Sequence, residues 1–185
     1  PDGAVWPRPA EPLAADVVLV AASGFTMEDD DRQTWGCCLT PRYAAMEPSI
    51  LTARLRLQLR DESDAEWNHE LLGEHEGGAN ESVQSVRRRL VEQRNRFRDS
   101  GIGLLTIRRR DDDEPMGYCG LIIGRCTLDE PEIAYELLQR FHGHGYATEA
   151  AHAVMNAAFA TGRSRIWSTV GAWNEPSLRV LDKLG

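Results

Sequence analysis

The segment RFHGHGYATEA, residues 140–150, constrains the fold most, because two glycines separate an apolar run from a helical pattern. The run PEIAYELL before it, residues 131–138, predicts a strand. Residues 147–160 predict a helix. A helix usually begins with Ser, Thr, Asp or Asn as its cap, so Gly143 and Gly145 suggest that the backbone itself must approach a ligand closely. The helical stripe has i, i+3, i+4, i+7, i+8 spacing: Ala151, Val154, Met155, Ala158 and Phe159.

A strand, a glycine-rich turn and a helix together can form an anion site. The first helical turn offers unpaired N–H groups and the positive end of the helix dipole, and glycine lets them converge on a phosphate. Two known phosphate motifs are absent: Gly145 is followed by Tyr146 and Ala147 instead of Lys-Ser/Thr, and Thr148 stands where a dinucleotide fingerprint needs a third glycine. The alternative is a glycine pair that only turns the chain.

The other elements surround this unit. A strand is expected at 51–59 with alternating leucines, helices at 61–72 and 80–99, a hairpin over 101–125, a strand at 165–170 and a helix from Asn174, its cap. Residues 1–45 are expected to be an N-terminal extension of unclear role with one apolar strand, DVVLVAAS. We expect the working domain at 46–185.

Composition limits the partners. The chain has 185 residues and a net charge of −8, which argues against nucleic acid and favours a cationic or amine substrate. Neither a membrane-spanning run nor a signal-peptide pattern is found, so we expect a cytoplasmic protein without a membrane partner. No Cys or His spacing fits a metal site, and His142 and His144 are expected to be turn side chains.

Arg140-Phe-His-Gly143-His-Gly145 resembles the Arg/Gln-x-x-Gly-x-Gly/Ala signature of the GCN5-related N-acetyltransferase (GNAT) superfamily. The sequences GYATEA after it, TARLRLQLRDESDAEWNHELL before it and NEPSLRVLDKLG late in the chain look like the ribosomal-protein-alanine acetyltransferase (RimJ/RimL-like) branch. The resemblance covers about residues 50–185 in the same order. It implies an α/β (α+β) GNAT fold, a mixed and mostly antiparallel sheet flanked by helices.

The resemblance also implies acetyl transfer from acetyl-CoA to a primary amine, either a protein N-terminus or a small molecule. In this family the backbone of the turn holds the cofactor diphosphate, and the open edge of the preceding strand pairs with the pantetheine arm. Homodimerisation is left open. The residues expected to bind the cofactor are Leu137, Leu138, Arg140, Phe141, His142, Gly143, His144, Gly145, Tyr146, Ala147 and Asn174.

Two catalytic roles follow from the same resemblance. Glu132 matches the strand glutamate that acts as general base in histone-acetylating relatives, and Glu136 on the same strand face is the alternative. The tyrosine that serves many relatives as acid is replaced by Leu181, and Ser177 is the substitute that the branch suggests. Each of these side chains also has a purely structural interpretation, as a solvated carboxylate or a hydroxyl bonded within its helix.

The superfamily usually continues past KLG with two closing strands, whereas this sequence ends at Gly185. We therefore expect the C-terminal hairpin to be missing, or replaced by a strand from residues 1–45. The alternative function is a non-catalytic acyl-CoA-binding module. A kinase-like phosphate-binding protein is disfavoured, because Lys-Ser/Thr and a metal-carboxylate pattern are lacking.

Overall fold

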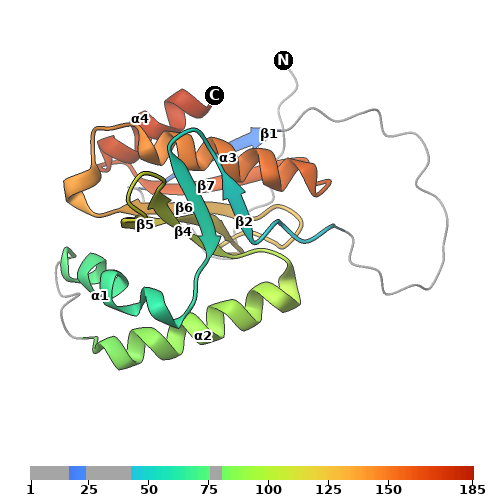
Figure 1. Cartoon of the computed structure of the whole chain (residues 1–185). Helices are drawn as coiled ribbons and strands as arrows, with labels where there is room; N and C mark the ends of the chain where they lie inside the picture. The colour runs from blue at the N-terminus through green and yellow to red at the C-terminus, as the bar shows by residue number, and fades with distance from the viewer. Residues whose placement is uncertain (1–16, 24–42, 76–80) are drawn as a thin grey trace, which may run out of the picture.

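The computed structural model describes residues 17–23, 43–75 and 81–185, and for 17–23 it describes the backbone alone (Figure 1). The elements are β1 (Val17–Ser23), β2 (Ser49–Leu51), β3 (Leu55–Leu59), η1 (Glu62–Asp64), α1 (Ala65–Gly73), α2 (Val83–Ser100), β4 (Leu104–Arg109), β5 (Pro115–Ile122), β6 (Glu132–Leu137), η3 (Gln139–Phe141), α3 (Tyr146–Ala160), β7 (Arg165–Gly171) and α4 (Glu175–Leu184).

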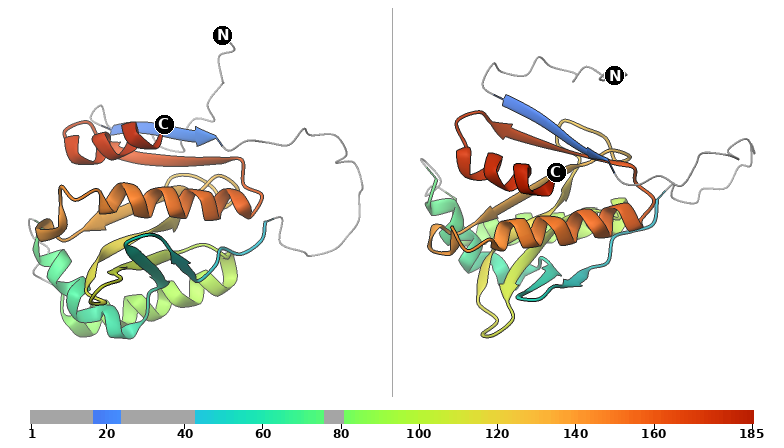
Figure 2. Two further views of the ribbon diagram at one scale, coloured as in Figure 1. Left: turned by 45° about the horizontal axis from the view of Figure 1, so that its top comes forward. Right: turned by 90° about the horizontal axis from the view of Figure 1, so that it is seen from above.

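The strands form one sheet in the order β1-β7-β6-β5-β4-β3-β2. All neighbours are antiparallel except β6 and β7, which are parallel. Helices α3 and α4 cover one face of the sheet, and α1 and α2 cover the other (Figures 1 and 2). This mixed α/β architecture confirms the predicted fold class.

The expected strand over 51–59 is in fact a hairpin. Leu55 and Leu57 of β3 are fully buried, as the alternation predicts, but Leu51 is 67% exposed and belongs to β2. The chain turns between them because the Thr52 hydroxyl accepts a hydrogen bond from the Leu55 N–H (2.9 Å). Alternation alone does not reveal this turn, because a polar residue is also expected there on the outer face of a strand.

Within the apolar segment DVVLVAAS, the described residues 17–23 form the expected strand. As β1 it pairs antiparallel with β7, from Val17 opposite Gly171 to Ser23 opposite Arg165. Met46 is 2% exposed, and its N–H donates to the Gly101 carbonyl (2.8 Å). The domain boundary at residue 46 stays a prediction, although β1 shows that part of the extension belongs to the sheet. The rest of the extension, residues 1–16 and 24–42, lies outside the described residues.

Candidate functional site

A gap in the sheet beside β6 creates the candidate site. On one side β6 pairs with β5 along its whole length, from Glu132 to Leu137. On the other side it pairs with β7 only where Glu132 lies opposite Trp167. Beyond this point the edge of β6 that faces β7 pairs with no strand among the described residues, and a cavity of about 570 Å³ lies beside it.

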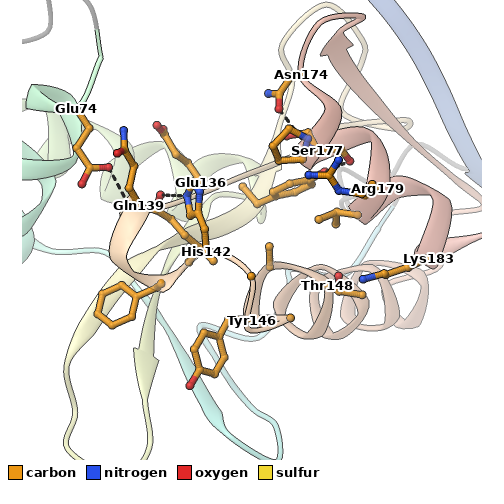
Figure 3. Close-up of a pocket in the computed structure, with 18 of the residues that line it drawn as sticks. Glu74, Glu136, Gln139, His142, Tyr146, Thr148, Asn174, Ser177, Arg179 and Lys183 are labelled. Carbon is orange, nitrogen blue, oxygen red and sulfur yellow. Dashed lines mark hydrogen bonds between the residues drawn. The ribbon is translucent and has the colours of Figure 1, made fainter.

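The cavity lies between the end of α1, β6, the start of α3 and α4 (Figure 3). Carboxylates and imidazoles line the side formed by α1 and β6, and basic side chains line the side formed by α4. The lining residues are Glu74, His75, Tyr135, Glu136, Leu137, Gln139, Phe141, His142, Gly143, Gly145, Tyr146, Ala147, Thr148, Asn174, Pro176, Ser177, Arg179, Val180 and Lys183.

The glycine turn opens into this cavity. Gly143 and Gly145 have φ angles of 80° and 77°, left-handed conformations that side chains other than glycine rarely adopt. A Cβ at Gly143 would meet no atom within 4 Å, and a Cβ at Gly145 would meet only an Arg54 nitrogen at 3.7 Å. Within the described part of the chain, no side chain forms a capping hydrogen bond at the start of α3. The N–H groups of its first turn therefore face open space, an arrangement that suits an anion.

An ion pair between distant segments fixes the start of α3. Glu149 accepts hydrogen bonds from the Thr52 hydroxyl (2.6 Å), the Arg54 N–H (3.0 Å) and Arg54 Nε (2.7 Å). Arg54 Nη1 also donates to the His144 carbonyl (3.0 Å), and its guanidinium lies 4.6 Å from the centre of the Tyr146 ring. Burial acts to raise the pKa of Glu149, yet the bonds from Thr52 and Arg54 together hold it below its ordinary value. The ionised pair positions the turn.

Tyr135 and Glu136 point to opposite faces of β6. The Tyr135 hydroxyl donates to the Ser177 carbonyl on α4 (3.2 Å), and burial raises the pKa of Tyr135 to about 12. The Glu136 carboxylate accepts from the Tyr118 hydroxyl (3.0 Å) and forms an ion pair with His75 Nε2. Burial, reinforced by Glu136, raises the pKa of Tyr118, so its phenol remains a hydrogen-bond donor. The cavity thus holds one carboxylate bound to an imidazole.

Glu132 lies elsewhere. The residue is 6% exposed, its carboxylate accepts from the Arg125 N–H (2.7 Å), and it does not line the cavity. The carboxylate also packs against Gly124, where an added Cβ would lie 2.7 Å from it. Its role as base therefore stays a prediction, and its position is that of a buried anchor for the loop between β5 and β6.

Three residues expected to bind the cofactor also lie outside the lining. Leu138 is fully buried, and its N–H donates to the Met116 carbonyl (2.9 Å). Arg140 pairs with Glu70 (2.5 Å) on α1. His144 bonds through Nδ1 to the His142 carbonyl (2.8 Å). The other expected cofactor residues line the cavity: Leu137, Phe141, His142, Gly143, Gly145, Tyr146, Ala147 and Asn174.

Ser177 and Asn174 begin α4 on the opposite side of the cavity. The Asn174 Oδ1 accepts from the Ser177 N–H (3.2 Å), so Asn174 caps the helix as well as lining the cavity. Ser177 lines the cavity, and its side chain interacts with the Tyr135 hydroxyl, a contact that acts to lower the pKa of Tyr135. The hydroxyl must exchange this partner in order to donate to a bound group.

Sequence reasoning missed two kinds of site residue. Arg54 is far from the turn in sequence, and no local pattern marks it. Arg179 and Lys183 carried a usable signal, because their spacing with Pro176 is i, i+3, i+7 and places all three on one face of α4. Among the described residues, no group of three or more His, Cys, Asp or Glu side chains is arranged to hold a metal ion.

The model of the GNAT acetyltransferase domain matches residues 54–185. The chain belongs to the GNAT acetyltransferase family. No curated protein matches the chain. None of the helices within the described ranges is long and apolar enough to cross a membrane.

Solved structures of acetyltransferases share the fold. An acetyltransferase from Agrobacterium tumefaciens strain C58 is 24% identical, with a TM-score of 0.60 over 84% of this chain and 88% of its own. The ribosomal-protein-S5-alanine acetyltransferase from Vibrio fischeri is 18% identical, with a TM-score of 0.64 over 75% and 82%. RimL, a ribosomal L7/L12 α-N-protein acetyltransferase in complex with coenzyme A, is 17% identical, with a TM-score of 0.63 over 74% and 82%.

Proposed function

We propose that this GNAT protein transfers the acetyl group of acetyl-CoA to a primary amine. The observation that carries the proposal is the uncapped glycine turn of α3 beside the open edge of β6. A diphosphate suits the N–H groups of residues 141–147, and an extended amide-bearing arm suits an unpaired strand edge. The cofactor bound to the structural neighbour RimL supports this interpretation.

Different parts of the cofactor would be bound by β6 and by the start of α3. The first turn of α3 would hold the diphosphate, and the ion pair of Arg54 with Glu149 would keep that turn in place. The Leu137 carbonyl is bonded to His142 Nε2 (2.8 Å), so His142 occupies the strand end next to the turn. The pantetheine arm would then run along the open edge towards Tyr135 and Ser177.

The reaction forms a C–N bond between the amine and the acetyl carbonyl and breaks the C–S bond of the thioester. The attacking nitrogen must be neutral and must lose a proton. We propose that Glu136 accepts this proton, directly or through one water, because it is the β6 carboxylate that lines the cavity. Its contact with His75 holds the carboxylate in place, and the proton then passes from Glu136 to water.

Ser177 serves the leaving sulfur. Its hydroxyl lies beside the Tyr135 hydroxyl, where α4 faces β6. A hydrogen bond from this hydroxyl would stabilise the developing thiolate, as preorganised donors do in other acyl transfers. The thiolate then takes its final proton from water.

The acceptor is a protein N-terminus or a small-molecule amine, and the ribosomal-protein acetyltransferases among the neighbours favour the first. The second candidate is an acyl-CoA-binding module without catalysis, which the Leu at position 181 favours. Release of free thiol from acetyl-CoA, measured with a panel of peptides and small amines, separates the two. Thiol release that depends on one class of amine is expected; tight CoA binding with no release for any amine would support the binding module.

A further inference from the structure

The positive charge of the cavity comes from α4. Among the described residues that line it, Arg179 and Lys183 are the only Lys or Arg side chains. They lie one turn apart on the same helix face, whereas the acidic residues Glu175 and Asp182 of α4 do not line the cavity. The helix thus places its two cations at the exposed rim of the cavity, in a chain whose net charge is −8.

These cations have weak protein partners or none. Lys183 forms no ion pair or hydrogen bond with any residue that the structure describes. Arg179 contacts only Glu175, at 3.3 Å, and both side chains are well exposed (65% and 78%), a setting in which an ion pair contributes little. Thr148, in the first turn of α3, lines the same cavity with its hydroxyl unbonded. Figure 3 shows the Lys183 ammonium extending towards Thr148.

An ammonium and a hydroxyl without protein acceptors among the described residues, beside a guanidinium with one exposed partner, form a donor set for a phosphate. The N–H groups at the start of α3 provide for a diphosphate. Coenzyme A carries one more phosphate, the monoester on its ribose, and a monoester holds about two negative charges at neutral pH. Lysine recognises such a group as a compact point charge, and Lys183 is the only lysine in the sequence.

We propose that Lys183, with Arg179 and Thr148, binds the ribose 3′-phosphate of coenzyme A and makes the protein prefer CoA over dephospho-CoA. This proposal rests on the proposed function, since it takes CoA as the ligand. It assigns α4 two parts of one molecule: Ser177 at the beginning of the helix meets the sulfur end, and Lys183 at its end meets the nucleotide end.

The test is calorimetric titration of the whole protein with CoA and with dephospho-CoA. We expect wild type to bind CoA about tenfold more tightly, and Lys183→Met to lose most of this preference by weakening CoA alone. Lys183→Arg keeps the charge and should keep most of the preference. Arg96→Met removes one positive charge from an exposed position on α2 and is the matched control, with no change in the ratio.

Each outcome decides one question. Equal binding of both ligands by wild type would overturn the phosphate assignment and leave the proposed function intact. Equal weakening of both ligands in Lys183→Met would also overturn it, because the lysine would then serve the diphosphate or only the C-terminal end of the helix dipole. If neither ligand binds to folded wild type, the proposed function itself fails.

The single lysine allows a second readout. An amine-reactive acylating reagent modifies Lys183 at a rate that mass spectrometry can follow on one peptide. CoA should slow this modification several-fold more than dephospho-CoA at equal occupancy. Equal protection by the two ligands would contradict the contact with the monoester.

Discussion

The two ends of β6 carry the same residue type on the same strand face, yet they differ in strand pairing and in exposure. At the closed end, Glu132 lies where β6 has a strand on both sides, and the residue is buried. At the open end, Glu136 has β5 on one side only, and its side chain is 27% exposed and faces the cavity. The difference shows that the position along the strand, more than the residue type, decides which glutamate can meet a substrate.

The two carboxylates provide the largest expected contrast. Glu136→Gln should lower kcat by about 10²-fold or more, the usual contribution of a general base, with CoA affinity unchanged. Glu132→Gln should leave kcat within a few-fold of wild type and lower the free energy of unfolding by ~1–3 kcal/mol, because a buried charge-assisted bond to the Arg125 N–H is weakened. Steady-state kinetics and denaturant unfolding of both variants measure this.

The opposite result would contradict the assignment of Glu136 as the base. If Glu132→Gln lowers kcat without loss of stability while Glu136→Gln keeps the wild-type kcat, the general base is Glu132, as the sequence alone suggested. Higher pH should partly restore the rate of whichever variant lacks the base, because more of the amine is then already neutral.

A substitution in the glycine turn tests the cofactor-binding part of the open end. Gly145→Val should weaken CoA binding at least about tenfold, or ~1.4 kcal/mol, because a β-branched residue does not accept φ of 77° and its side chain would occupy the open space before α3. Calorimetry gives the affinity, and circular dichroism checks that the variant is folded. A folded variant with wild-type affinity for CoA would show that the glycines only turn the chain and do not make room for the diphosphate.

Ser177→Ala tests the opposite side of the cavity. Loss of the hydroxyl should lower kcat about tenfold and leave CoA affinity nearly unchanged, because the donor matters only as charge develops on sulfur. The free energy of unfolding should fall by no more than about 1 kcal/mol, since the hydroxyl loses only its contact with the Tyr135 hydroxyl. An equal loss of affinity and kcat/KM, with kcat preserved, would instead make Ser177 a binding residue.

The smallest expected effect concerns the ion pair that holds the turn. The folded-state pKa of Glu149 lies below its ordinary value. Its stabilisation is therefore complete above the ordinary pKa near 4.5 and is lost as the pH falls through the lower folded-state value. Glu149→Gln should cost about 1 kcal/mol at neutral pH, and the difference from wild type should shrink on acidification. A difference that grows towards low pH would contradict the ionised pair.

Sequence patterns predicted the fold well because its elements are local. The period of α3, the cap of α4 and the strand DVVLVAAS can each be recognised in a short window. The split between β2 and β3 was missed, because the turn depends on how Thr52 bonds to Leu55 and to Glu149 on α3. Patterns of alternating residues do not contain such contacts.

The candidate site was less predictable, because its residues come from segments far apart in the chain. The motif located the turn and most of its lining, but Leu138, Arg140 and His144 have the right sequence positions and point elsewhere. The sequence assigns Glu136 to a strand face but does not place it in a cavity, because the cavity depends on contacts with distant segments such as His75 after α1. Which of two glutamates is exposed depends on where β7 leaves β6, and β7 lies some thirty residues later.

Amide hydrogen exchange with and without CoA tests whether the cofactor binds along the open end of β6 and on the turn of α3. CoA should slow exchange in peptides that cover residues 135–147, while β4, which has a strand on both sides, should change little. If exchange over 135–147 is unchanged at saturating CoA and protection is found elsewhere, the cofactor does not bind at the open end of β6.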